Sequence, residues 1–176
     1  MKKIHPKICK AANGHTFVVR QAIPGDAEKI VVFTRAILGE SPYLLTALDE
    51  FTVTKEQQGQ LLRDIHWDSG KLALLAESGS EIIGYLDFHN GHRKRTKHQG
   101  SFGMSVKKDS RNQGVGKALV ASLLEWAESS PLIEKICLEV VAEIMNMPSV
   151  SMKNSALQKR VSEAMPSRIP MAAIMI

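Results

Sequence analysis

The stretch KKDSRNQGVGKALVASLLEWA, residues 107–127, places two glycines one residue apart directly before a helical segment. From Val115 to Trp126, apolar residues recur near helical spacing, which predicts a helix with one buried stripe. The segment GSFGMSV at 100–106 comes before this stretch and has the composition of a strand. The sequence therefore predicts a strand, a short glycine-containing loop and a helix that begins near Gly114.

Such a loop can bind an anion. The first N–H groups of a helix lack intrahelical partners and lie at the positive end of the helix dipole. Glycines at 114 and 116 would let a phosphate approach the backbone closely, although an ordinary tight turn would also use them. Four basic residues lie nearby: Lys107, Lys108, Arg111 and Lys117. They could add positive charge to an anion site, or they could simply belong to a solvated loop. The spacing matches neither a Walker loop nor G-x-G-x-x-G, which disfavours a nucleoside triphosphate or a Rossmann dinucleotide.

The rest of the chain predicts one α/β domain. Strands are expected at 16–23, 71–78, 81–89, 100–106 and 133–141, and helices at 24–38, from Thr54 onward and from Gly114 onward. Thr54 and Gln57 have the spacing of a capping box. The order β-α-α-β-β-β-α-β indicates a mixed, mostly antiparallel sheet flanked by helices.

Composition narrows the function classes. The net charge is +5, but residues 144–176 contribute four basic residues and one acidic, so the remainder is nearly neutral and favours no nucleic-acid partner. No apolar run reaches the length of a membrane span and no secretory signal is visible, so we expect no membrane association. Two cysteines, Cys9 and Cys137, form neither a disulfide framework nor a metal spacing, which suits a cytoplasmic protein.

The segment RNQGVG, with its preceding strand and following helix, resembles the R/Q-x-x-G-x-G/A motif of the GNAT superfamily of acetyl-coenzyme A-dependent N-acetyltransferases. The resemblance covers roughly residues 16–143 and implies a GNAT-like fold with acetyl-CoA as co-substrate. It implies that backbone N–H groups hold the coenzyme pyrophosphate and that the strand end pairs with the pantetheine arm. The implied cofactor-binding residues are Met104, Ser105, Val106, Arg111, Asn112, Gln113, Gly114, Val115, Gly116 and Lys117.

The same resemblance implies how the reaction runs. A strand that bulges and splays from its neighbour would leave a slot, in which a primary amine on a small molecule or a protein N-terminus attacks the thioester directly. Glu139 is a candidate base that deprotonates the amine, although an outward carboxylate is the plainer explanation of its position. No tyrosine follows Tyr85, so the usual proton donor to the thiolate is missing. The segment Glu40–Tyr43 could shape the amine pocket or be a plain linker.

Other readings stay open. One is a CoA-binding protein with reduced or no catalysis, and another is a nucleic-acid module that uses the basic segment 92–98. That segment has no interleaved aromatics and is better explained as a solvated hairpin loop, and His98 as a loop-end histidine. No metal is expected, because His89, His92 and His98 are joined by no Cys or carboxylate at a known spacing.

Residues 144–176 depart from the family pattern. They contain six of the eight methionines and no Gly, Asp or aromatic residue. Read one base out of register, with favourable codon choices, they yield a sequence typical of the family. We therefore divide the chain into a GNAT-like domain at 1–143 and an atypical tail at 144–176, a possible frameshift product. Alternatively the tail is genuine and forms a helix from about Val150; a homodimer is possible in either case.

Overall fold

The computed structural model describes residues 4–40, 46–138 and 150–153, the last four as backbone only. The described elements, in chain order, are β1 (Lys7–Lys10), β2 (Thr16–Gln21), the 3-10 helix η1 (Pro24–Asp26), α1 (Ala27–Glu40), α2 (Lys55–Trp67), β3 (Lys71–Ser78), β4 (Glu81–Asn90), β5 (Gln99–Val106), the 3-10 helix η2 (Lys108–Ser110), α3 (Val115–Glu128), β6 (Lys135–Leu138) and β7 (Val150–Lys153). The predicted α/β class is confirmed.

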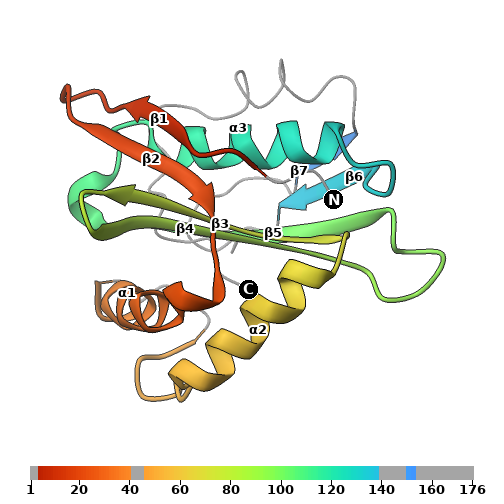
Figure 1. The fold of residues 1–176 in the computed structure, drawn as a ribbon, viewed down its shortest axis with the longest axis horizontal. Helices are drawn as coiled ribbons and strands as arrows, with labels where there is room; N and C mark the ends of the chain where they lie inside the picture. Colours follow the sequence, from red (N-terminus) through yellow and green to blue (C-terminus); the bar gives the residue numbers. More distant parts are fainter. Residues whose placement is uncertain (1–3, 41–45, 139–149, 154–176) are drawn as a thin grey trace.

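These strands form one sheet of seven in the order of the chain, β1 to β7. Every neighbouring pair is antiparallel except β5 and β6, which are parallel and are connected through α3. α3 lies on one face of the curled sheet, and α1 and α2 lie on the other (Figure 1). The sheet is thus mixed and mostly antiparallel, as predicted, with a helix layer on each side.

Each face of the sheet has its own hydrophobic core. On the α3 face, Leu119 and Leu123 are fully buried against Leu86, Phe88 and the rest of that cluster. On the opposite face, the buried stripes of α1 and α2 meet the other side of β3, with Ala73 and Leu75 in that second cluster. β3 is therefore buried on both faces, which explains why KLALLAES reads as an apolar run rather than an alternation.

The helix boundaries follow local sequence signals. Thr54 caps α2: its hydroxyl accepts from the Gln57 N–H at 3.3 Å and the Gln57 side chain accepts from the Thr54 N–H at 2.9 Å. α3 ends at Glu128, two residues before Ser130-Pro131, a pair that disfavours a continuing helix.

An ion-pair cluster fixes the corner where β2 leads into α1. Arg20 reaches both carboxylate oxygens of Asp26, at 2.7 and 2.8 Å, and Glu77 at 2.9 Å. Burial opposes the ionisation of Asp26, but hydrogen bonds from Arg20 and the Ile23 N–H hold its pKa below its usual range. The Arg20 hydrogen bond likewise lowers the pKa of Glu77.

Three expectations need correction. β1 was not predicted, and it adds an edge strand before the first expected one. β5 runs in unbroken register with β4 from Asn90↔Gly100 to Gly84↔Val106, so the bulge expected there is absent from that pairing; a register irregularity falls instead in β3. Residues 150–153 form a strand antiparallel to β6, where a helix was one alternative.

Candidate functional site

The glycine loop ends in a left-handed residue at the start of α3. Gly114 caps the helix with φ 89° and ψ −1°, and Asn112 also has a positive φ of 59°. A Cβ built on Gly114 would meet no atom within 4 Å, so backbone conformation, not crowding, is what favours glycine there. Both residues turn the chain so that it enters α3 immediately after η2.

The entry to α3 leaves a run of backbone donors open. Ala118 N–H is the first of the helix to be satisfied, by the Gly114 carbonyl at 3.0 Å. Within the described part of the chain, the N–H groups of residues 112–117 have no hydrogen-bond acceptor. These groups lie at the positive end of a 14-residue helix, which makes the loop able to bind an anion.

Gln113 anchors the loop to the β1–β2 hairpin. Its carbonyl accepts from Ala12 N–H at 3.2 Å, its side-chain oxygen accepts from Asn13 Nδ2 at 2.5 Å, and its side-chain nitrogen donates to the Asp109 carbonyl at 2.9 Å. The Gln113 side chain is therefore engaged with protein, and only its backbone N–H is open. β1, which the sequence reading missed, thus helps to hold the loop.

The predicted basic residues divide into two groups. Arg111 turns inward: its Nε donates to the Val106 carbonyl at 3.1 Å and its guanidinium lies 3.4 Å from Glu40. The Lys107 ammonium pairs with Glu81. Lys108 and Lys117 have exposed side chains. The positive charge open to a bound anion therefore comes from the helix end and these two lysines, while Arg111 acts as a clamp.

Glu40 completes that clamp. It is the last residue of α1, and its carboxylate accepts from the Lys108 N–H at 3.0 Å as well as facing Arg111. The C-terminal end of α1 is thereby tied to the loop that precedes α3. The rest of the segment considered for an amine pocket, residues 41–43, lies outside the described residues, as does the candidate base Glu139.

α3 approaches the sheet closely at one glycine. A Cβ on Gly84 of β4 would lie 3.0 Å from both Leu119 Cδ1 and Val115 Cγ1. Val115 and Gly116 at the start of the helix are both buried. This contact sets the height of the α3 N-terminus above β4 and β5.

β5 presents alternate backbone groups to its two sides. Lys107 N–H donates to Ile83 of β4 and the Gln99 carbonyl accepts from Gly91, so odd-numbered residues of β5 bond toward β4. Met104 and Val106 therefore direct their N–H groups to the other edge. Pairing with β6 on that edge is described only from Gln99↔Lys135 to Phe102↔Leu138. Beyond Phe102 the edge has no partner among the described residues, apart from the Val106 carbonyl that Arg111 occupies.

The side chains of the same strand end differ in direction. Met104 and Val106 are buried in the core beneath α3. Ser105 points to the α1 and α2 face, is 2% exposed, and its hydroxyl has no described partner. In the register of the sheet it lies beside Tyr85, whose buried hydroxyl lies near the Gln58 side chain without a well-formed hydrogen bond. Burial raises the pKa of Tyr85 well above its ordinary value, so its phenol stays neutral.

A histidine–carboxylate pair lies on the α1 and α2 face of the sheet, and the sequence analysis did not predict that the two residues are paired. His89 Nε2 is 3.0 Å from Asp87 Oδ2, and both side chains are partly exposed. The sequence reading considered His89 only as a metal ligand, together with His92 and His98. The alternation in YLDFH, residues 85–89, places Asp87 and His89 on one face of a strand, and this was the available signal.

The basic segment 92–98 forms the loop between β4 and β5. Asn90 Nδ2 donates to the Lys97 carbonyl at 2.9 Å, and the His98 carbonyl accepts from Glu134 and Lys135 at the start of β6. Among the described residues no cluster of three or more His, Cys, Asp or Glu side chains could hold a metal ion. In the same part of the chain, no helix combines the length and the apolar character that a membrane span requires.

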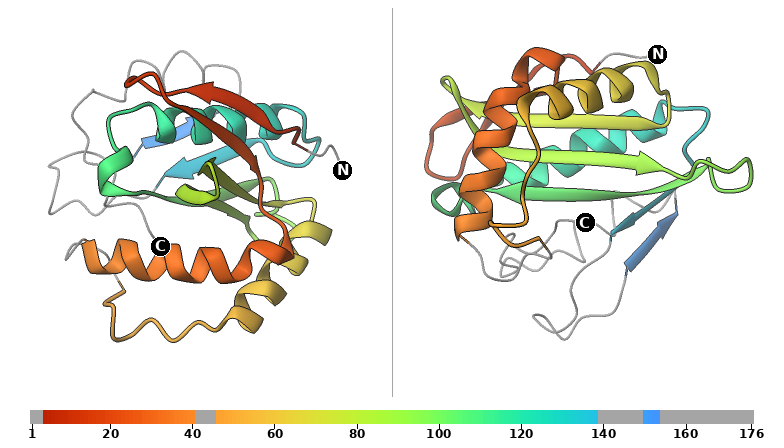
Figure 2. Two further views of the ribbon diagram at one scale, coloured as in Figure 1. Left: turned by 60° about the vertical axis from the view of Figure 1, so that its left-hand side comes forward. Right: turned by 90° about the horizontal axis from the view of Figure 1, so that it is seen from below.

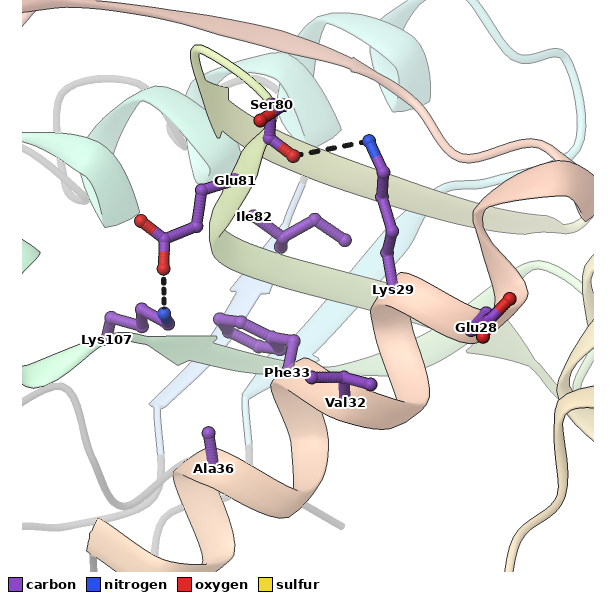
Figure 3. Close-up of a pocket in the computed structure, with 9 residues that line it drawn as sticks. All are labelled: Glu28, Lys29, Val32, Phe33, Ala36, Ser80, Glu81, Ile82 and Lys107. Carbon is purple, nitrogen blue, oxygen red and sulfur yellow. Dashed lines mark hydrogen bonds and ion pairs between the residues drawn. The ribbon is translucent and has the colours of Figure 1, made fainter.

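A pocket of about 300 Å³ lies between α1 and the β3–β4 turn (Figure 3). Phe33, Val32 and Ile82 supply its apolar wall, while Lys29 donates to the Ser80 carbonyl at 3.2 Å and Lys107 pairs with Glu81 at its rim. Its polar rim groups are thus engaged with one another. The pocket borders the start of the glycine loop but does not include the open N–H groups.

Solved structures resemble this fold. An acetyltransferase of the GNAT family from Streptococcus pneumoniae is 26% identical, with a TM-score of 0.66 over 69% of this chain and 72% of that one. A ribosomal-protein-alanine N-acetyltransferase from Brucella melitensis gives 20% identity and a TM-score of 0.57 over 68% and 71%. A GNAT superfamily phosphinothricin acetyltransferase from Sinorhizobium meliloti, solved with acetyl-CoA, gives 16% and 0.57 over 73% and 65%.

Comparisons of the sequence alone identify the family. None of the curated proteins compared with the chain matches it. The sequence profile described as the acetyltransferase (GNAT) family matches residues 42–152, which span the glycine loop, α3 and the strands on either side of them. The chain belongs to the GNAT family of acetyltransferases.

Proposed function

We propose that this chain is an acetyl-CoA-dependent N-acetyltransferase that transfers the acetyl group to a primary amine by direct attack. The observation that carries the proposal is the run of open backbone donors at residues 112–117, at the start of a helix in a family of acetyltransferases. A coenzyme pyrophosphate carries the negative charge that such donors bind.

The residues present fit the coenzyme. The N–H groups of residues 112–117 would hold the pyrophosphate, with Lys108 and Lys117 adding charge from their exposed side chains. Gly114 is open on its Cβ side, so the backbone is accessible to a phosphate there. Arg111 would contribute by holding the loop through Val106 and Glu40 rather than by contacting phosphate with its side chain.

The edge of β5 would take the pantetheine arm. Met104 N–H, Met104 C=O and Val106 N–H lie on the edge away from β4, without a partner among the described residues. An extended amide-containing arm can pair with such an edge as an added strand does. Ser105 faces the other way and would contribute its backbone position, not a contact to the arm.

When bound, acetyl-CoA supplies an activated acetyl group as a thioester. The protein must orient the amine, take its proton and exclude competing water. Glu139 remains a proposed proton acceptor on sequence grounds, and it lies outside the described residues. The family match supports acetyl transfer, and the amine that receives the acetyl group is to be identified by screening.

The names of two structural neighbours illustrate the range of acceptors. One is named for an alanine of a ribosomal protein and the other for phosphinothricin. A protein N-terminus and a small molecule are therefore both worth screening. A second candidate function is coenzyme binding with little or no catalysis, favoured by the absence of any tyrosine after Tyr85 and by the unusual composition of residues 144–176.

The test is a calorimetric titration of the 176-residue chain with acetyl-CoA, followed by thiol release with a panel of small amines and N-terminal peptides. Saturable binding with amine-dependent thiol release is the expected result. Binding without thiol release for any amine would favour the second candidate. A folded chain that binds no acetyl-CoA would contradict both.

A further inference from the structure

One face of β4 and β5 carries a row of polar groups. β4 presents Tyr85, Asp87 and His89 at alternate positions, and in register they lie beside Ser105, Gly103 and Ser101 of β5. The intervening residues Leu86, Phe88, Phe102 and Met104 belong to the core under α3, so the polar row faces the α1 and α2 side. Figure 2 (right) shows α1 crossing near the start of β4 and α2 lying toward β3, and neither ribbon covers the later half of β4.

Asp87 and His89 form a pair in the later half of β4. Asp87 Oδ2 lies 3.0 Å from His89 Nε2, with 30% of the Asp87 side chain and 38% of the His89 side chain exposed. If Nε2 carries the proton that Asp87 accepts, Nδ1 is left with its lone pair. Nδ1 has no described hydrogen-bond partner. The pair thus combines an oriented imidazole with an available proton acceptor.

The strands on either side of β4 carry small residues next to Asp87. Asp87 is flanked in register by Ala73 on β3 and Gly103 on β5, which have the two smallest side chains. Gly103 also directly follows Phe102, the last residue of β5 with a described partner on β6. The pair therefore lies one strand, or about 5 Å, from the point where the β5 edge becomes open.

Orphaned polar atoms give a second, independent indication of a ligand here. Ser105 Oγ is buried with no hydrogen-bond partner among the described residues, and the Tyr85 hydroxyl and Gln58 Nε2 lie near one another without a well-formed hydrogen bond. The Tyr85 hydroxyl is buried, and burial together with the nearby Asp87 charge raises the pKa of Tyr85, so it stays a neutral donor. Buried polar groups in native proteins are normally satisfied, so several on one face indicate a polar binding region.

Other titratable groups frame the pair. Lys71 of β3 lies beside His89 in register and is paired with Asp68 at 3.1 Å. His92, in the loop after β4, lies close enough to Asp68 to help lower the pKa of that carboxyl. From β5, the register neighbours of the pair are Ser101 and Gly103, which do not titrate near neutrality. Lys71 is engaged with Asp68, so Asp87 is the charge in direct contact with His89.

We infer that His89, in place of Glu139, accepts the proton of the acceptor amine, with Asp87 as the residue that positions its imidazole; this inference rests on the proposed function. Neutral His89 Nδ1 takes one proton from the ammonium form of the acceptor. The freed nitrogen forms a bond to the acetyl carbon as the carbon–sulfur bond breaks. A second proton passes from that nitrogen to the thiolate through solvent, and His89 returns its own proton to water.

The activity test compares matched glutamine and asparagine variants. His89→Gln should lower kcat about 100-fold or more and remove the acid limb of its pH profile, because the neutral imidazole is then lost as acceptor. Asp87→Asn should lower kcat less and keep an acid limb. His5→Gln, at an exposed histidine before β1, is the control and should change neither. All variants should bind acetyl-CoA with wild-type affinity, since none contributes to residues 104–117.

Two results would overturn the inference while leaving the proposed function intact. One is a His89→Gln enzyme with kcat within threefold of wild type. Another is an acid limb that survives in His89→Gln but disappears in Glu139→Gln. Failure of wild-type acetyl-CoA binding would instead count against the proposed function.

A spectroscopic test does not depend on turnover. The ring nitrogens of His89, observed by NMR in the free chain at high pH, should show the Nε2–H tautomer in wild type. That preference should weaken in Asp87→Asn, because the carboxylate that accepts from Nε2 is lost. A wild-type ring with its proton on Nδ1 would leave no acceptor facing the amine and would refute the proposal, even if no acceptor amine had yet been found.

Discussion

Replacing Gly114 by asparagine and by aspartate separates backbone strain from charge at the helix entry. Gly114 has φ 89° and open space on its Cβ side, so either side chain fits sterically and meets only conformational cost. That cost is about 1–2 kcal/mol for a left-handed residue, partly offset by about 0.4–1 kcal/mol from the less flexible unfolded chain. Both variants should therefore lose about 1 kcal/mol of unfolding free energy and differ little from each other.

Their coenzyme affinities should differ much more. Asparagine and aspartate have nearly the same shape, so the difference between them isolates one negative charge beside the open N–H groups. At about 5 Å from one phosphate charge, and with an effective dielectric constant of roughly 20–80, the repulsion is about 1–3 kcal/mol. Gly114→Asp should thus bind acetyl-CoA about 5- to 150-fold more weakly than Gly114→Asn.

Calorimetric titration with acetyl-CoA at about 50 mM and about 500 mM salt measures this difference, which should shrink at high salt as the charges are screened. Gly79, in the β3–β4 turn, also has a positive φ (60°) and open space, so the same two substitutions there are the control. Equal affinities of the two Gly114 variants at low salt, or an equal difference at Gly79, would refute an anion site at the start of α3.

Three further outcomes follow from contacts near and below the site. Arg111→Met should lower the unfolding free energy by about 1–3 kcal/mol, because the carbonyl at the end of β5 loses a charged donor; urea unfolding that matches wild type would contradict the clamp. Arg20→Met should destabilise the chain by about 2 kcal/mol at neutral pH, because Asp26 loses its ion-pair partner. The pKa of Asp26 is lowered in the folded state, so the ion pair stabilises the chain above the ordinary Asp pKa of 3.8 and less as the pH falls below it. The unfolding free energies of wild type and variant should therefore converge in acid. Gly84→Ala should cost about 1–3 kcal/mol and weaken coenzyme binding, because its Cβ would lie 3.0 Å from Leu119 and displace α3; an unchanged melting temperature would show that the helix shifts freely.

Local signals in the sequence predicted the elements that build the site. The capping box at Thr54 and the glycine turn before α3 each record a backbone requirement that few other residues meet, so their structural meaning could be read directly. β1 escaped prediction because KICK, residues 7–10, is short and half charged, as an edge strand often is. Its role in holding Gln113 depends on a contact across about 100 residues, which local reasoning cannot supply.

The direction of individual side chains could not be predicted from the sequence either. Arg111 reads as a phosphate ligand in sequence, yet in the fold its guanidinium faces Val106 and Glu40. Glu40 comes from a different helix, and only the packing of α1 against the loop brings the two together. Asp87 and His89 could be placed on one face by alternation, but their neighbours Ala73 and Gly103 depend on strand register, which no single segment encodes.

Residues 144–176 remain a prediction from sequence, whether as a frameshift product or as a genuine tail. Reading the coding DNA distinguishes the two: codons that cannot yield the family-like sequence in the shifted frame would exclude a lost base. The proposed coenzyme site and the His89 inference rest on residues 40–138 and do not depend on that outcome, whereas the second candidate function does.

Hydrogen exchange of backbone amides with and without acetyl-CoA tests the central claim most directly. The N–H groups of residues 112–117 have no described partner, so they should exchange fast in the free chain and slow markedly on binding. Met104 and Val106 should slow as well, while the loop at residues 91–98 should not change. Saturable binding that leaves residues 104–117 exchanging at their free rates would show that the coenzyme is held elsewhere and would contradict this account.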